Sequence, residues 1–97
     1  MFQDLDPLLH SQVRLAIMSI LLGVDKAEFS YLLDNIKTTK GNLSFQLGKL
    51  KDADYIHIEK STKGNYPLTL CHITENGVEA YEQYVVSIKE YFERSKE

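Results

Sequence analysis

Several residues between Thr39 and Leu50 are of types that contact nucleic acids. This segment, TKGNLSFQLGKL, repeats leucines at helical spacing, which predicts a helix with one buried face. At about 100° per residue, Gly41, Phe45 and Gly48 fall on the opposite, exposed side. Glycine lets a backbone come close to its target, and phenylalanine can press on a thymine methyl group. The outer face of this helix therefore suits close contact with DNA.

Polar side chains edge the same face. Asn42 can form paired hydrogen bonds with adenine, and Lys49 can reach guanine or phosphate. Ser44, Thr39 and the N–H groups of the first turn suit phosphate. The helix has no arginine, so we expect weak base reading and a preference for A/T-rich sites. With the neighbouring turn and hairpin, the predicted DNA-binding set is Lys37, Thr39, Lys40, Gly41, Asn42, Ser44, Phe45, Gly48, Lys49, Lys60, Lys63 and Asn65.

The net charge of −3 argues against DNA binding, but the distribution of charge favours it. Residues 1–36 carry −3, residues 37–63 carry +3 and residues 64–97 carry −3. A locally basic segment can attract a polyanion although the whole chain is acidic. The alternative is that these lysines form an ordinary solvated surface. The basic segment contains six lysines, namely Lys37, Lys40, Lys49, Lys51, Lys60 and Lys63.

A first helix is predicted before this segment. Asp6 and Pro7 are typical of a helix start, Ser11 is a second capping position, and Gly23 ends the helix. Its buried face is predicted from apolar residues at helical spacing, which are Val13, Ala16, Ile17, Ile20 and Leu21.

Two further helices follow with a short turn between them. Asp25 predicts the start of a helix over about 26–35, and Thr38 or Thr39 the start of a third helix that ends near residue 53. Only about four residues separate the two helices. This is the sequence pattern of a helix-turn-helix, here over about 26–53.

The periodicity then changes to that of strands. Residues 55–60 and 68–73 are rich in β-branched and aromatic side chains, which predicts two strands. Residues 61–67 contain Gly-Asn and Pro, the chemistry of a hairpin loop. The pattern predicts a β-hairpin, or wing, over about 55–73.

Thr74 predicts the start of a long last helix over about 75–94. Its apolar residues form one stripe, which consists of Val78, Tyr81, Val85, Ile88 and Phe92. A helix that packs on one core needs an apolar arc of about 100°, and neighbouring residues make this stripe wider than that. We expect the surplus, with the N-terminal segment, to pack on a second copy. The alternative is that both segments only cover their own core. The predicted dimerisation set is Phe2, Leu5, Leu8, Leu9, Tyr81, Tyr84, Val85, Ile88, Tyr91 and Phe92.

The predicted order is three helices, a β-hairpin and a long helix. With 97 residues the chain has room for one core, so a single domain over 1–97 is expected. The fold class is mainly α with a β-hairpin, that is, a winged helix-turn-helix.

Three runs also resemble a known family. From about Leu5 to Tyr91 the chain is similar to the small stand-alone winged-helix transcriptional regulators of the MarR/ArsR-like group. The runs that carry the resemblance are LDPLLHSQVRLAIMSILL, GNLSFQLGKLKDADYIHIEK and ITENGVEAYEQYV. The resemblance implies a dimeric cytoplasmic DNA-binding protein with its third helix in the major groove and its wing near the adjacent minor groove or backbone. Such wings often carry arginines after the glycine, whereas this one has none. Asp54 stands where a glycine often closes the third helix.

Catalytic and metal-binding chemistry is not indicated. The candidate zinc ligands lack the spacing of a zinc site; they are His10, His57, His72 and the single Cys71. No phosphate-binding glycine loop occurs in the sequence. No nucleophile, base and orienting group can be proposed, so we expect a protein that is not an enzyme and needs no cofactor. The N-terminus carries acids where a signal peptide carries lysines, and no run of about 18 apolar residues occurs. These features predict a cytoplasmic protein outside the membrane.

The sequence thus predicts a homodimeric DNA-binding transcriptional regulator that binds double-stranded DNA at a palindromic operator. The alternative is a winged-helix protein-interaction module that has lost sequence-specific DNA reading. The net acidity, the arginine-free wing and the outward-facing Phe45 motivate that alternative.

Overall fold

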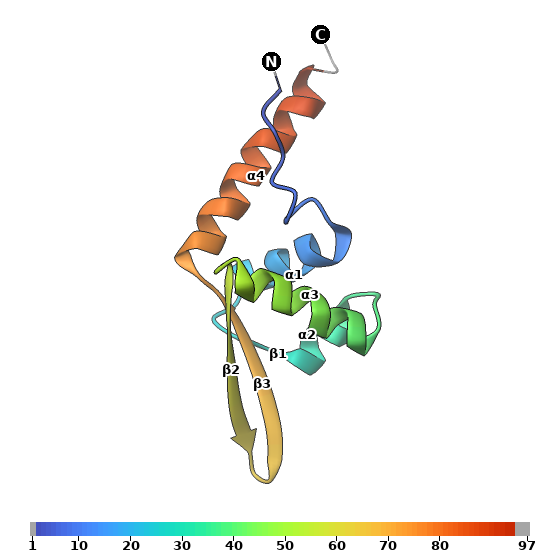
Figure 1. Cartoon of the computed structure of the whole chain (residues 1–97), viewed down its shortest axis with the longest axis vertical. Helices are drawn as coiled ribbons and strands as arrows, with labels where there is room; N and C mark the ends of the chain where they lie inside the picture. The colour runs from blue at the N-terminus through green and yellow to red at the C-terminus, as the bar shows by residue number, and fades with distance from the viewer. Residues whose placement is uncertain (1, 95–97) are drawn as a thin grey trace.

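The computed structural model describes residues 2–94, in which a helical body lies between two projections (Figure 1). The body contains α1 (Gln12–Leu22), α2 (Phe29–Asn35) and α3 (Lys40–Asp52). A β-hairpin extends from one end of the body, and α4 (Glu75–Arg94) extends from the other beside the N-terminal segment. The molecule is therefore elongated, with extents of 58 × 26 × 21 Å. The predicted winged-helix fold is confirmed.

The first helix begins at the second of the two predicted positions. Ser11 is the N-cap of α1, and its Oγ accepts a hydrogen bond from the Arg14 backbone N–H at 3.5 Å. Asp6 instead closes a separate turn, where its Oδ1 accepts from the Leu8 N–H at 2.9 Å. This turn brings Leu9 into the core, where it is fully buried.

The start of the second helix was predicted wrongly. Ala27–Glu28 form a short strand, β1, and α2 begins only at Phe29 without a side-chain cap. Ala27 pairs with Cys71 of the hairpin and is buried, so tertiary pairing prevails over the local capping signal at Asp25. A strand of two residues is too short to produce a periodic pattern.

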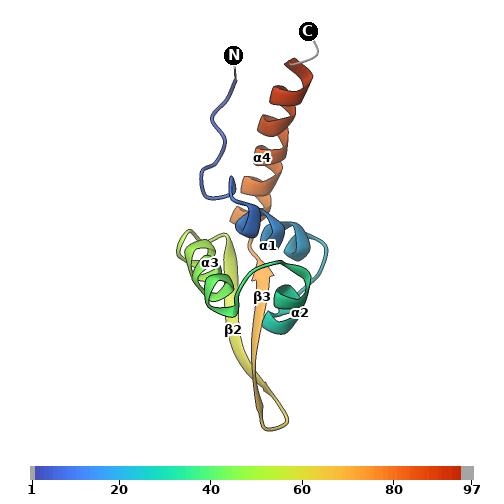
Figure 2. The ribbon, with the colours of Figure 1, turned by 90° about the vertical axis from the view of Figure 1, so that its right-hand side faces the viewer.

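The hairpin consists of β2 (Ile56–Lys63) and β3 (Tyr66–Ile73), and the sheet order is β1-β3-β2, antiparallel throughout. The predicted seven-residue loop is in fact a two-residue turn, Gly64–Asn65, because the strands continue pairing to its edge. Gly64 has φ +64°, a conformation that glycine adopts without steric cost. Figure 2 shows this long, narrow hairpin projecting beyond α2 and α3.

The last helix has the predicted boundaries, and its cap is also confirmed. The Thr74 Oγ1 accepts a hydrogen bond from the Gly77 N–H at 3.0 Å. The buried stripe of α4, however, contains Gly77, Tyr84 and Ser87 rather than the predicted valines. None of the helices among residues 2–94 is long and apolar enough to cross a membrane.

Candidate nucleic-acid interface

Helix α3 has the two faces that its sequence predicts. Thr39 is the N-cap, and its Oγ1 accepts from the Asn42 N–H at 3.1 Å. Leu43, Leu47 and Leu50 point into the core and are at most 2% exposed. The opposite face, with both glycines, Ser44 and Phe45, is turned to solvent, although Gly48 is partly covered.

The two glycines of α3 are not required by packing within the chain. A Cβ built at Gly41 or Gly48 meets no atom within 4 Å. Glycine within an exposed helix costs about 1 kcal/mol relative to alanine. The backbone of this face is left bare without any internal benefit, which is the geometry that close approach of a partner needs.

Phe45 stands at the centre of the bare face. Its side chain is 59% exposed, and the Lys49 Nζ lies 5.1 Å from the ring centroid, within the range of a cation–π contact. An exposed ring with a cation above it offers an apolar surface and a positive charge together. This combination suits contact with a base edge and its neighbouring phosphate.

Asn42 belongs to an internal network instead of the exposed face. It is half-buried, its Nδ2 donates to the Thr38 Oγ1 at 2.8 Å, and its Oδ1 accepts from the Gln46 Nε2 at 3.1 Å. The Gln46 Oε1 in turn accepts from Arg14 of α1. These bonds fix α3 on α1, so Asn42 is better explained as a positioning residue than as the adenine contact that we predicted.

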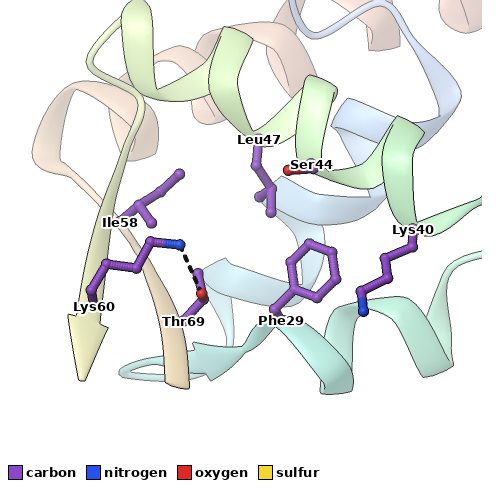
Figure 3. A pocket seen from close by; sticks show the side chains of 7 residues that line it. All are labelled: Phe29, Lys40, Ser44, Leu47, Ile58, Lys60 and Thr69. Atoms are coloured by element: carbon purple, nitrogen blue, oxygen red, sulfur yellow. Dashed lines mark hydrogen bonds between the residues drawn. The ribbon is translucent and has the colours of Figure 1, made fainter. Parts of the chain in front are cut away.

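A recess of about 250 Å³ lies between α3, the start of α2 and the hairpin (Figure 3). Lys40 from α3 and Lys60 from β2 stand on its walls, and the Lys60 Nζ donates to the Thr69 Oγ1 at 3.0 Å. Two ammonium groups on different elements, with hydroxyl groups between them, suit a phosphate group. The lining residues are Phe29, Lys40, Ser44, Leu47, Ile58, Lys60 and Thr69.

The contribution of Thr69 to the recess escaped the sequence prediction. Its place follows from strand register, because Thr69 lies directly opposite Lys60 in the hairpin. The predicted loop over residues 61–67 left that pairing undefined.

The positive charge around the recess is not neutralised by ion pairs within the part of the chain that the structure describes. Among residues 2–94, the six lysines of the basic segment have no carboxylate oxygen within 4.0 Å. Glu59 of β2 is paired with Lys26, whose Nζ lies 2.9 Å from its Oε2, and this hydrogen bond lowers the pKa of the Glu59 carboxyl. Lys26 thus offsets the charge of the acid that precedes Lys60 in β2.

The predicted DNA-binding residues of the turn and of the hairpin tip are not among those that line the recess. Lys37 is exposed in the turn before α3, and Lys63 and Asn65 are exposed at the tip of the hairpin. Beside them Tyr66, which the prediction left out, is 76% exposed.

The predicted dimerisation residues fall into two groups. Leu9 and Tyr84 are buried in the chain's own core, and Leu5 and Leu8 are packed against it. These four residues cover the chain's own core, as the alternative prediction held for the two segments, and Tyr81 and Ile88 are packed against the core as well. The others lie outside the core or at its margin, where the Phe2 ring stacks on Tyr91 with centroids 4.6 Å apart.

Comparison with known proteins identifies the family. The family model of the winged helix DNA-binding domain matches residues 13–92. This range includes the hairpin and all four helices, except for the first residue of α1 and the last two residues of α4. The chain belongs to this family.

This winged-helix domain has similar proteins in archaea and bacteria. It is 33% identical over 79 residues to an uncharacterized protein of Methanocaldococcus jannaschii, covering 81% of this chain and 86% of that one. A transcriptional regulator homologue from Pyrococcus horikoshii is 30% identical, with a TM-score of 0.81 over 89% of this chain and 85% of that one. A putative MarR-family regulator from Enterococcus faecalis shares the fold, with 17% identity and a TM-score of 0.75 over 92% and 82% of the chains.

The predicted resemblance to the MarR/ArsR-like group is confirmed by these neighbours, which include regulators of both families. The named relatives of this winged-helix domain are transcriptional regulators rather than enzymes. A DNA-binding winged-helix protein is thus the functional class of the chain.

Proposed function

We propose that this protein is a homodimeric transcriptional regulator that places α3 in the major groove of its operator and the hairpin on the adjacent backbone. The observation that carries the proposal is the bare outer face of α3, where a Cβ at either glycine meets open space, beside a recess between two lysines. A major groove about 12 Å wide accepts a helix, and a bare backbone allows it to enter deeply.

Within this arrangement each part of the site has a separate role. Phe45 contacts a thymine methyl group, and Lys49 beside it reaches a base edge or phosphate. Lys40 and Lys60 hold one phosphate of the strand that runs through the recess. The polar contacts to bases are few. Affinity for DNA therefore comes mainly from contacts with phosphates, and sequence specificity comes mainly from the shape of A/T-rich DNA and from contacts with thymine methyl groups.

Salt dependence tests this proposal directly. Fluorescence anisotropy with the DNA upstream of the protein's own gene should give binding that weakens with salt, because about four to six lysines displace counterions and the slope of log affinity against log salt is about −4 to −5. A scrambled duplex of equal composition serves as the control. Binding that is absent at low salt, or that does not change with salt, contradicts the proposal.

The proposed dimer is supported by the two apolar stripes of α4. One stripe faces the chain itself and consists of Gly77, Ala80, Tyr84, Ser87 and Tyr91. The next stripe repeats the same alternating spacing of three and four residues, which is the pattern of a helix pair, and consists of Val78, Tyr81, Val85, Ile88 and Phe92. On this second stripe Tyr81 and Ile88 are partly buried against the chain's own core, Val85 is half-buried and Phe92 is 64% exposed. A second copy would cover the apolar surface of the stripe that remains exposed to solvent.

Val85→Glu should convert the dimer to a monomer, because it inserts a charge at the middle of the second stripe. Sedimentation should then report the 11.2 kDa chain instead of twice that mass. Val86→Glu is the matched control, since the 56% exposed Val86 lies one residue further round the helix, outside the stripe. A Val85→Glu protein that remains dimeric, or a wild type that is monomeric at micromolar concentration, contradicts this interface.

The dimer also defines the expected operator. A two-fold protein binds two half-sites related by the same symmetry, with centres about one helical turn of DNA apart.

The alternative function, a protein-interaction module, is favoured by the exposure of Phe45 alone. Membership of the DNA-binding family weighs against it. A Phe45→Ala variant that loses a protein partner, in a chain that binds no DNA, would support that alternative.

A further inference from the structure

Asp54 follows α3 in a backbone conformation that glycine adopts more readily than any other residue. It comes directly after the C-cap Ala53 and has φ +61°, in the left-handed region where helices often end on glycine. Among residues 2–94 it is the one non-glycine residue with a positive φ. Its N–H donates to the Lys51 carbonyl oxygen at 2.9 Å, a backbone bond that glycine would form equally well. The end of α3 alone therefore does not account for a side chain at this position.

The side chain of Asp54 is bonded to the start of α4. Its Oδ2 accepts a hydrogen bond from the Asn76 Nδ2 at 2.7 Å, and its carbonyl oxygen accepts one from the Thr74 Oγ1 at 2.6 Å. The Thr74 N–H donates to the Tyr55 carbonyl oxygen at 3.0 Å. These bonds tie the segment after α3 to the first turn of α4, and we call the four residues Asp54, Tyr55, Thr74 and Asn76 the joint.

The direction of α4 depends on the joint and on two contacts further along the helix. Figure 2 shows α4 leaving the body and running away from it beside the N-terminal segment. The Tyr81 hydroxyl lies 2.9 Å from the Ser19 Oγ, and the Tyr84 hydroxyl lies 2.9 Å from the His10 Nδ1. Because the tyrosines hold the middle of α4 and the joint holds its start, loss of the joint leaves the helix free to tilt about the tyrosines.

A small tilt at this place has a large effect in a two-fold dimer. Thr74 precedes the two tyrosines by seven and ten residues, or about 12 Å along the helix. A tilt of about 10° moves the joint by about 2 Å, and two-fold symmetry doubles the displacement to about 4 Å, close to the roughly 3.4 Å step of one base pair. The angle at the joint therefore matters on the scale at which the spacing of half-sites changes.

From these contacts we propose that Asp54 is a positioning residue, which fixes the direction of α4 relative to α3 and thereby the separation of the two α3 helices in the dimer. This inference rests on the proposed function, because it takes α4 as the dimer helix and α3 as the DNA-contacting helix. The separation of the two α3 helices determines which half-site spacing the dimer accepts. Asp54 thus acts on the choice of operator through the joint and not through contact with a base.

Double electron–electron resonance measures the separation of the two protomers directly. Tyr31→Cys supplies the site for a nitroxide label, because Tyr31 is 51% exposed on α2 and lies outside the joint, whereas the native Cys71 is fully buried. With the joint intact, the labelled dimer should give a narrow distribution of distances. Asp54→Gly and Asn76→Ala should each broaden it by several ångströms, because each removes the hydrogen bond between the two side chains.

DNA binding is the second measurement, and Asp54→Asn is the matched control. Asparagine tolerates a positive φ, keeps an acceptor oxygen for Asn76 and removes the same charge as Asp54→Gly does. One hydrogen bond changes a conformational equilibrium by about threefold to tenfold, and apparent affinity falls with the fraction of competent protein. Asp54→Gly should therefore bind the upstream duplex about threefold to tenfold more weakly than Asp54→Asn, which should keep the narrow distribution. Both should melt within a few degrees of wild type.

The outcomes that overturn the inference are distinguishable from failure of the proposed function. If Asp54→Gly and Asn76→Ala give the distance distribution of Asp54→Asn, the joint does not set the direction of α4 and only this inference fails. A broadened distribution with unchanged affinity also overturns it, because the choice of operator then does not depend on the joint. If the labelled wild type shows no distance between protomers at micromolar concentration, the proposed dimer fails and this inference fails with it.

Discussion

Replacing Gly48 with glutamate should abolish DNA binding and leave the fold intact. A Cβ at this position meets no atom within 4 Å, so the chain has room for the new side chain. Glutamate brings bulk and a negative charge to the face that we propose enters the groove. Juxtaposed like charges cost several kcal/mol, so affinity should fall by at least about a hundredfold.

Gly23→Glu is the matched control for this variant. It makes the same exchange and the same change of charge at the exposed end of α1, where a Cβ lies 3.8 Å from its nearest neighbour, the Ile20 carbonyl oxygen. Anisotropy titrations should show little change for this control, and circular dichroism should show that both variants are folded. If Gly48→Glu retains wild-type affinity, α3 does not carry the DNA-binding surface.

Replacing Gly77 with alanine should strongly destabilise the fold. A Cβ at Gly77 would lie 2.1 Å from the Tyr55 carbonyl oxygen and 2.8 Å from the Ile73 Cγ1. The same oxygen accepts a hydrogen bond from the Thr74 N–H at 3.0 Å, so the start of α4 cannot move away without losing that bond. Only glycine allows α4 to begin this close to the start of the hairpin.

The size of the effect follows from two opposing terms. Overpacking costs about 1–3 kcal/mol or more, whereas alanine gains about 1 kcal/mol of helix propensity. Contact with a rigid backbone oxygen places the cost at the upper end, so we expect a net loss of about 2 kcal/mol and a Tm lower by roughly 10 °C. Thermal and urea unfolding measure both quantities.

Gly48→Ala is the control, because it makes the same exchange in open space. This variant should gain up to about 1 kcal/mol of stability from helix propensity alone. A Gly77→Ala protein as stable as wild type would show that α4 can shift on the hairpin without cost.

Local signals account for most of what was predicted correctly. The boundaries of α3 and α4 follow from caps at Thr39 and Thr74, which bond to N–H groups only three residues away. The leucines of α3 recur at helical spacing, so their burial and the exposure of Phe45 follow from periodicity. Such features depend on neighbours in the chain, which a single sequence contains in full.

Contacts between distant segments account for the errors. The strand at Ala27 exists because Cys71 lies beside it, and the length of the hairpin depends on pairing that the loop-like composition of residues 61–67 conceals. The amide of Asn42 is bonded to Gln46, which α1 holds through Arg14, so its role depends on a helix about thirty residues away.

The sequence by itself determined the order of the elements, the bare face of α3 and the basic segment around it, because capping, periodicity and charge are local properties. Only the tertiary structure decided which stripe of α4 is buried. Both stripes are largely apolar at the same spacing, and the close approach of Gly77 to Tyr55 orients the helix so that Tyr84 faces inward. The tertiary structure also placed Lys40 and Lys60 around one recess and Tyr66 at the tip of the wing. The positions of Lys60 and Tyr66 follow from strand register, which depends on pairing between two separate segments.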